Sequence, residues 1–250
     1  MSSDPRKLER SLTEAAAERA QERSGEASPW TTALRELASV DQAAYEAVAR
    51  TATPSLDEPI QRLSNAANYS RLWLGIAAVI ALLGGERGRK AALEGVVAIG
   101  VTSASVNLLA KSIAARPRPD REELERFATR VVEMPSSSSF PSGHAASAFA
   151  FSYAVGRHLP ELAVPIRLLA GAVAYSRVHI GVHYPGDVAV GSMIGSGIAA
   201  MVASVGDRVA GRRRRAEAPS RVHPRRSSPS ANSAAWARYP TKPGRGAGGR

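Results

Sequence analysis

One uncharged run of apolar and small residues, Val188–Gly206, limits what this chain can fold into more than any other feature. A helix of about 20 such residues is long enough to cross the hydrocarbon core of a bilayer. The run contains Gly191 and Gly195, a spacing that lets the backbones of two membrane helices approach closely. We therefore expect this segment to span a membrane and to pack tightly on another helix.

Four shorter apolar stretches precede this run, at 72–85, 91–110, 144–156 and 163–176. Each is short or carries a charge such as Glu94, so a soluble helical bundle with an apolar core is the alternative. Their high content of Ala, Gly and Ser favours membrane helices. Charged residues gather in the short loops between them, and Arg212–Arg215 follow the last run, as at a cytoplasmic boundary. The pattern predicts an all-α membrane bundle of about five transmembrane helices.

The residues before the first stretch are more polar. Residues 1–29 form a polar arm rich in Ala, Glu and Arg, and residues 30–69 form an amphipathic helical region. Within it, apolar residues recur three and four apart, so this helix could pack on a core or lie in the membrane interface. We expect Leu56–Tyr69 to extend the first span as one long helix.

The basic charge of the chain is concentrated in its C-terminal segment. Residues 211–250 carry eleven Lys and Arg against one Glu, which is +10 of the net charge of +11. Residues 207–250 lack the apolar content of a core, so we predict a disordered basic tail. Beside a final span, attraction to anionic membrane lipids is a simpler role for this tail than nucleic-acid binding. The sequence does not indicate an oligomeric state.

Three short polar clusters lie at ends of the apolar stretches that share one side of the predicted membrane. They are Lys111 with Arg118-Pro119, then Pro141-Ser142-Gly143-His144, and finally Ser176-Arg177 with His183 and Asp187. If the basic loops and the tail are cytoplasmic, these clusters are extracytoplasmic in an integral protein of the cell membrane. Five arginines between residues 112 and 140 weigh against this orientation, because the same rule counts Lys and Arg.

The positive groups in these clusters are suited to binding a phosphoryl group. Lys111, Arg118 and Arg177 would place three positive charges around one point, and arginine adds a two-pronged donor. Ser142 and Gly143 precede a helix that we expect to begin near His144, and the free N–H groups of a helix start favour an anion.

The two histidines and the aspartate supply the groups for covalent catalysis. Asp187 can accept the Nδ1–H of His183, which leaves the other ring nitrogen as a nucleophile. His144 is then available as general acid toward the leaving alkoxide. The set predicts phosphoryl transfer through a phosphohistidine, followed by hydrolysis. Because side chains supply the positive charge, we expect no metal or other cofactor. The chain contains no cysteine, which excludes a cysteine nucleophile and disulfides.

The three clusters resemble the signature motifs of the type 2 phosphatidic acid phosphatase (PAP2) superfamily, membrane lipid phosphatases that share a helical core with vanadium haloperoxidases. The resemblance covers residues 70–206 and implies a PAP2-like domain that hydrolyses a lipid phosphate monoester or diphosphate. Phosphatidic acid, polyprenyl phosphates and phosphorylated prenyl-sugar lipids are the candidate substrates. The resemblance implies the roles given above for His183, Asp187 and His144, and phosphate binding by Lys111, Arg118, Ser142, Gly143 and Arg177.

Several nearby residues fall outside the motif positions. Arg116-Pro117 is at the wrong spacing and is interpreted as a bystander, and His179 as a structural residue. The serine run 135–140 either flanks the mouth of the site or is a flexible loop.

Two other functions are compatible with parts of the sequence: a vanadate-dependent haloperoxidase, and a membrane-anchored protein that binds nucleic acid or anionic lipid through the tail. The first is disfavoured because the known haloperoxidases are soluble.

Overall fold

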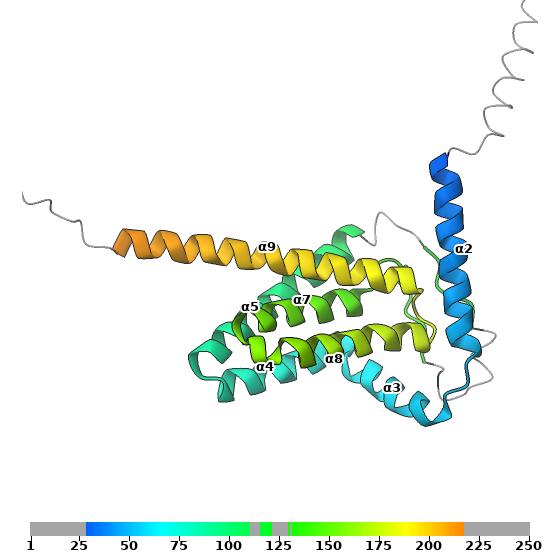
Figure 1. The fold of residues 1–250 in the computed structure, drawn as a ribbon, viewed down its shortest axis with the longest axis horizontal. Coiled ribbons are helices and arrows are strands. Elements are labelled where there is room, and N and C mark those ends of the chain that lie inside the picture. The colour runs from blue at the N-terminus through cyan, green and yellow to red at the C-terminus, as the bar shows by residue number, and fades with distance from the viewer. Residues whose placement is uncertain (1–28, 111–115, 122–129, 131, 218–250) are drawn as a thin grey trace, which may run out of the picture. The chain divides into compact units, whose positions relative to one another are not determined.

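The structure is a computed structural model of the chain, and it describes residues 29–110, 116–121, 130 and 132–217. The chain divides into two compact units, residues 1–209 and 210–250. Every regular element among the described residues is a helix, as predicted (Figure 1). The helices are α2 (Pro29–Arg50), α3 (Pro54–Ala66), the short 3₁₀ helix η1 (Asn68–Ser70), α4 (Arg71–Leu83), α5 (Gly85–Ser105), the π-helical turn η2 (Val106–Ala110), α7 (Gly143–His158), α8 (Pro160–His179) and α9 (Pro185–Glu217).

The main core lies between α4, α5, α7 and α8, which run side by side (Figure 1). Its two large members, Trp73 and Phe151, are nearly fully buried and pack with ring centroids 5.4 Å apart. Half of the remaining buried positions are alanines, so the helices approach closely. Gly95 of α5 lies directly against Phe151, where an added Cβ would come within 2.7 Å of the ring.

Helix α9 packs on the first turns of α7 through glycine, as the glycine spacing predicted. A Cβ on Gly195 would lie 2.0 Å from the carbonyl oxygen of Ala146, and one on Gly191 would lie 2.5 Å from that of Ser142. The two backbones are therefore in direct contact. This contact joins the start of α7 to the start of α9.

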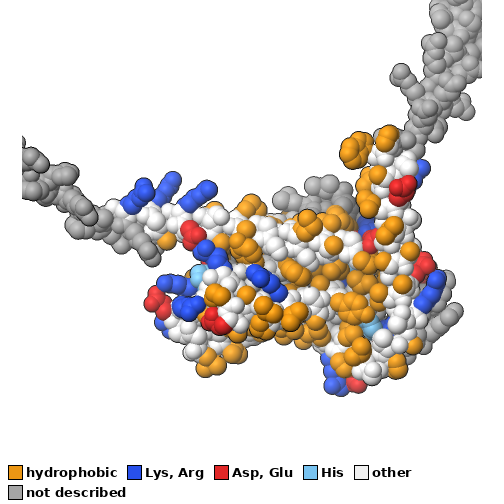
Figure 2. Space-filling view, viewed as in Figure 1, with side chains coloured by type: hydrophobic (Ala, Val, Ile, Leu, Met, Phe, Trp, Pro, Cys, Tyr) orange, Lys and Arg blue, Asp and Glu red, His pale blue; other side chains and the backbone are white. Residues whose placement is uncertain are grey.

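The face of the bundle seen in Figure 2 carries many apolar side chains, as a surface in contact with a bilayer requires. Large side chains on the helices are exposed, among them Leu82, Leu83, Leu93, Leu168 and Met193. Charged side chains gather instead at the ends of helices, around the α4–α5 and α7–α8 loops. In α2, the apolar residues Trp30, Leu34, Leu37 and Val40 are also exposed, whereas Tyr45 and Ala49 are buried.

The predicted number of five spans is not confirmed. Among the described residues, two helical segments are long and apolar enough to cross a membrane alone, Gly85–Leu108 and Pro185–Arg212. A third is possible if α3 and α4 act together as one broken span. Helices occupy the other predicted stretches, but α7 has only 16 residues, about 24 Å of helix against a hydrocarbon core of about 30 Å.

The expectation that Leu56–Tyr69 continues the first span as one long helix is wrong. Helices α3 and α4 meet at a bend of 64°. The backbone turns through Tyr69 and Ser70, whose φ angles are 53° and 58°, a left-handed conformation that is strained for residues other than glycine. The bend is stabilised because α3 packs on the C-terminal end of α8, where His179 binds Asp57.

Helix α9 also continues past Gly206, the predicted end of the last span, to Glu217. Residues 207–217 are therefore helical, and the prediction that the disordered tail begins at residue 207 is wrong. Arginine and alanine favour helix, so the basic cluster at 212–215 can continue it. Residues 1–28 and 218–250, where we predict the polar arm and the rest of the tail, lie outside the described residues.

The contact between α7 and α9 makes a direct prediction. Gly195→Ala should lower the thermal stability of the purified protein in detergent, because its methyl group would overlap the carbonyl oxygen of Ala146. Overpacking of this kind costs about 1–3 kcal/mol. The matched control is Gly197→Ala in the same helix, where an added Cβ meets nothing within 4 Å. It should be neutral or stabilising, and equal melting temperatures for the two variants would contradict the predicted contact.

Candidate active site

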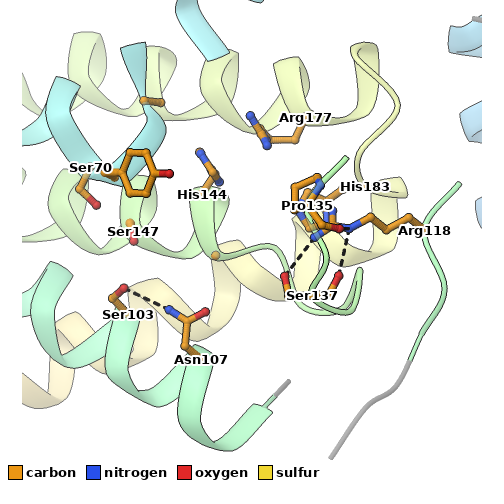
Figure 3. A pocket seen from close by; sticks show the side chains of 13 residues that line it. Ser70, Ser103, Asn107, Arg118, Pro135, Ser137, His144, Ser147, Arg177 and His183 are labelled. Carbon is orange, nitrogen blue, oxygen red and sulfur yellow. Dashed lines mark hydrogen bonds between the residues drawn. The ribbon is translucent and has the colours of Figure 1, made fainter. Parts of the chain in front are cut away.

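The structure brings most of the predicted site residues together around one cavity of about 220 Å³ at the N-terminal end of α7 (Figure 3). Five of them line it: Arg118, Gly143, His144, Arg177 and His183. Ser142 and Asp187 are fully buried. Lys111, the remaining predicted residue, lies outside the described residues. The motifs that are far apart in the sequence therefore meet in one place.

The start of α7 has the features of an anion site. Ser142 is the N-cap, and its hydroxyl accepts a hydrogen bond from the backbone N–H of Ala145 at 3.4 Å. The helix begins at Gly143, one residue before the predicted start. The first N–H groups of a helix have no partner within the helix, and the helix dipole favours negative charge there. The N–H of Ser142 donates to the carbonyl oxygen of Asp187 at 3.0 Å, which joins this start to α9.

His183 lies in the turn between α8 and α9. Its backbone N–H donates to the carbonyl oxygen of Arg177 at 3.2 Å, and this bond fixes the turn. The side chain is only 3% exposed, and its Nδ1 lies 3.6 Å from Oδ2 of Asp187. This distance is longer than a hydrogen bond. The predicted pair is therefore adjacent, with the carboxylate beside the nitrogen that we expected it to orient.

Three donors hold the carboxylate of Asp187 in place. The N–H of Tyr184 donates to Oδ2 at 2.9 Å, and the hydroxyl of Ser139 donates to the same oxygen. Nη1 of Arg116 donates to Oδ1 at 2.8 Å. Because these bonds use both oxygens, Asp187 has a fixed orientation in its buried position.

Sequence reasoning missed two of these donors. Arg116 was interpreted as a bystander, but it contacts the carboxylate of Asp187, and Ser139 belongs to the run whose role was left open. Arg116 is 71 residues from Asp187 and Ser139 is 48 residues from it. No local spacing could reveal either contact, because only the fold brings these segments together.

Arg118 connects the serine run to the cavity. Its guanidinium donates to the carbonyl oxygens of Pro135 at 3.1 Å and Ser137 at 3.0 Å, and also to that of Val182. Burial lowers the pKa of Arg118 from its usual value, although arginine stays charged at neutral pH. Pro135 and Ser137 line the cavity, so this part of the serine run flanks the site.

Arg177 is a buried cation with an open donor. It is 4% exposed, and its Nη1 donates to the hydroxyl of Ser64 in α3. Its Nε has no hydrogen-bond partner among the described residues. A buried charge without full hydrogen bonding is costly, and an anion in the cavity would remove that cost. Arg177 is therefore well suited to binding phosphate.

His144 and His179 occupy different surroundings. Nε2 of His144 lies 2.9 Å from Oδ1 of Asn68, so the bend between α3 and α4 places a partner for this ring. His179 does not line the cavity. It is buried, and its Nε2 lies 3.0 Å from Asp57, which also binds the fully buried Arg130. These contacts support the interpretation of His179 as a structural residue.

The electrostatics of the cavity favour a neutral His183. Burial lowers the pKa of His183, and the charges of Arg118 and Arg177 lower it further, whereas Asp187 raises it. The uncharged ring has the free electron pair that a nucleophile needs. Among residues 29–110, 116–121, 130 and 132–217, no group of three or more His, Asp or Glu side chains could hold a metal ion.

Comparison with known proteins decides the family. Residues 91–209 match the model of the PAP2 superfamily. The chain is 34% identical to decaprenylphosphoryl-5-phosphoribose phosphatase of Mycobacterium tuberculosis over 153 residues. These residues cover 61% of this chain and 82% of that protein. The chain belongs to the PAP2 superfamily. The family that the three motifs predicted is confirmed, and the protein is a phosphatase, a hydrolase of phosphoric esters.

Among the solved structures similar to this PAP2 protein are two that cover about two thirds of the chain. The transmembrane PAP2-type phosphatidylglycerolphosphate phosphatase of Bacillus subtilis has a TM-score of 0.53 at 26% identity, covering 70% of this chain and 88% of that one. LpxE of Aquifex aeolicus has a TM-score of 0.53 at 23% identity, covering 64% and 92%, and this likeness concerns the fold alone. Together with the candidate spans, the first similarity identifies an integral membrane protein.

The state of His183 sets a testable pH dependence. Since the pKa of His183 is lowered from 6.5, kcat/KM for a short-chain lipid phosphate should fall on acidification with an apparent pKa below 6.5. Stability should fall over the same window, because the unfolded chain, with its higher histidine pKa, binds more protons there. Rate profiles and chemical denaturation between pH 4.5 and 8 measure both effects, and His183→Gln should reduce the pH dependence of stability. An acid limb above pH 6.5 would contradict this assignment.

Proposed function

We propose that this protein is a lipid phosphate phosphatase that transfers the phosphoryl group first to His183 and then to water. One observation carries the proposal: a buried histidine, whose pKa is lowered, lies beside a fixed carboxylate in a cavity that two arginines line. A neutral nucleophile and positive charge are what phosphoryl transfer requires.

The reaction follows from the positions of the side chains. With Nδ1 of His183 facing Asp187, the nitrogen left for attack is Nε2. A bond forms from Nε2 to phosphorus as the bond from phosphorus to the alkoxide oxygen breaks, and His144 gives that oxygen a proton. A water molecule then gives a proton to His144 and attacks phosphorus, which releases phosphate and His183. Asp187 stabilises the positive ring, and Arg118 and Arg177 stabilise the charge on the phosphoryl oxygens.

We further propose that the substrate is a phosphorylated prenyl-sugar lipid, one of the candidates named from the sequence. A second cavity of about 620 Å³ shares His144, Arg177 and Ser137 with the first. Its other polar lining residues are Asn65, Asn68, Glu133 and Ser136. Amide, carboxylate and hydroxyl groups can pair with the hydroxyls of a sugar, whereas phosphatidic acid has none beside its phosphate. The name of the mycobacterial relative also describes a phosphorylated sugar on a prenyl lipid.

The arrangement of α7 supports an extracytoplasmic site. The candidate active site is at the N-terminal end of this helix, and the basic loop with Arg157 is at its C-terminal end. Arg87, in the other basic loop, donates to the carbonyl oxygen of His158 at 2.9 Å, so both loops lie at that end. If the basic loops are cytoplasmic, the site faces the opposite side.

The catalytic roles are tested by phosphate release from a panel of lipid phosphates in detergent with EDTA present. We expect activity in the wild type and a loss of at least about a thousandfold in His183→Ala, which lacks the nucleophile. His144→Ala should lose most with substrates whose leaving group is a poor one. With a ³²P-labelled substrate, quenching without acid should trap label on the wild-type protein. The same experiment should trap none on His183→Ala. Full activity of that variant, or an absolute requirement for Mg²⁺, would contradict the mechanism.

The substrate class is tested by Asn65→Ala, which changes the second cavity without touching the first. We expect KM for a phosphorylated prenyl-sugar lipid to rise about fivefold to tenfold, the effect of one lost hydrogen bond. KM for phosphatidic acid should stay unchanged. Equal effects on the two substrates, or better turnover of phosphatidic acid by the wild type, would contradict the sugar assignment.

A further inference from the structure

Helix α2 precedes the residues that match the family model, yet one of its side chains reaches the candidate active site. Asp41 lies with Oδ2 2.8 Å from Nη1 of Arg116. Its Oδ1 accepts a hydrogen bond from the N–H of Gly186 at 2.6 Å. The approach is close, because a Cβ on Gly186 would lie 2.8 Å from Asp41. Asp41 thus contacts both an arginine of the site and the first turn of α9.

These contacts complete a row of alternating charges. Nη1 of Arg116 lies 2.8 Å from Asp41 and 2.8 Å from Asp187, and Asp187 lies 3.6 Å from His183. The side chain of Asp187 is fully buried, that of Asp41 is 12% exposed and that of Arg116 is 27% exposed, so solvent screens the two carboxylates little and Arg116 only in part. In this row, the carboxylate of Asp41 balances the charge of Arg116, and the carboxylate of Asp187 remains to attract a positively charged His183.

Aromatic contacts hold α2 at this position by other means. The guanidinium of Arg116 lies over the ring of Tyr184, 4.0 Å from its centroid. Tyr184 packs edge-to-face on Tyr45 of α2 with centroids 5.7 Å apart, and the hydroxyl of Tyr45 donates to the carbonyl oxygen of Asp120 at 2.7 Å. The helix therefore has a docking contact at Tyr45 that is separate from the charged contact at Asp41.

We propose that Asp41 is a positioning residue for the reaction, which acts through Arg116 to set the orientation and effective charge of Asp187 and so the basicity of His183. The inference rests on the proposed function for its kinetic consequences. Without Asp41, the charge of Arg116 would act on Asp187 alone. Asp187 would then stabilise the positive ring of His183 less well, and the start of α9 would lose an acceptor for the Gly186 N–H.

The decisive variant is Asp41→Asn, which keeps the shape of the side chain and removes its charge. We expect kcat to fall roughly tenfold, the scale of a small loss of alignment, with KM within about twofold. The acid limb of the rate profile should move to lower pH. The charged groups that face His183 are Asp187, Arg118 and Arg177, and removing a negative charge behind Asp187 leaves the two arginines to lower the pKa of His183 further.

Three variants separate this role from simple docking. Glu36→Gln removes one negative charge from an exposed position of the same helix and should behave as the wild type. Asp41→Glu restores the charge and should recover part of kcat and the wild-type pH profile. Tyr45→Phe loses the bond to Asp120 and should lower the melting temperature without moving the pH profile. If Tyr45→Phe and Asp41→Asn lower kcat equally and neither shifts the pH dependence of the rate, the only role of α2 is to pack against the site. The proposal is then wrong.

A titration of His183 needs no catalytic activity, so it tests the role of Asp41 independently of the proposed function. The ring nitrogens of the five histidines can be labelled with ¹⁵N and titrated by NMR in detergent, with His183→Gln identifying the signal. We expect the pKa of His183 to be lower in Asp41→Asn than in the wild type and in Glu36→Gln. A wild type that releases no phosphate from any lipid would sink the proposed function but not this shift. An active wild type with the same His183 titration and the same kcat in Asp41→Asn overturns the inference alone.

Discussion

The site depends on one backbone contact, between the first turns of α7 and α9. Gly191 and Gly195 leave no side chain between the helices, and the N–H of Ser142 binds the carbonyl oxygen of Asp187 at 3.0 Å. Both helix starts carry candidate catalytic groups, His144 on α7 and the His183–Asp187 pair at α9. Because packing through glycine leaves little room for adjustment, the two groups are held at a constant separation.

Buried ionic contacts complete this arrangement around the helix starts. Arg116 and Arg130 are not free surface charges: the first lies between Asp41 and Asp187, and the second is fully buried against Asp57. Losing one partner of a fully buried pair such as Arg130–Asp57 costs about 3–5 kcal/mol, since a charge is left without compensation. Arg116 is 27% exposed, so the cost there is smaller. Arg116 and Arg130 are among the five arginines between residues 112 and 140 that weigh against an extracytoplasmic position of that segment. Their ion pairs with Asp41, Asp187 and Asp57 give these two arginines a structural role.

The motifs made much of the site predictable. Their spacing led to the family, to the helix that starts within one residue of His144, and to the adjacency of His183 and Asp187, because short-range patterns encode helix starts and turns. The bend at Tyr69 and Ser70 was missed, since neither residue is a glycine that would signal a left-handed backbone. The predicted number of five spans is not confirmed, because apolar composition does not separate a short buried helix such as α7 from a spanning one.

The sequence by itself determined the helical class, the glycine contact of α9, and the set of candidate catalytic groups, which follows from which side chains exist and from their local spacing. Only the tertiary structure decided what holds those groups in place. Asp41, Arg116 and Ser139 meet at Asp187 and the segment beside it from positions tens of residues apart. Such contacts depend on how the helices pack rather than on any repeat along the chain, so no local pattern could have revealed them.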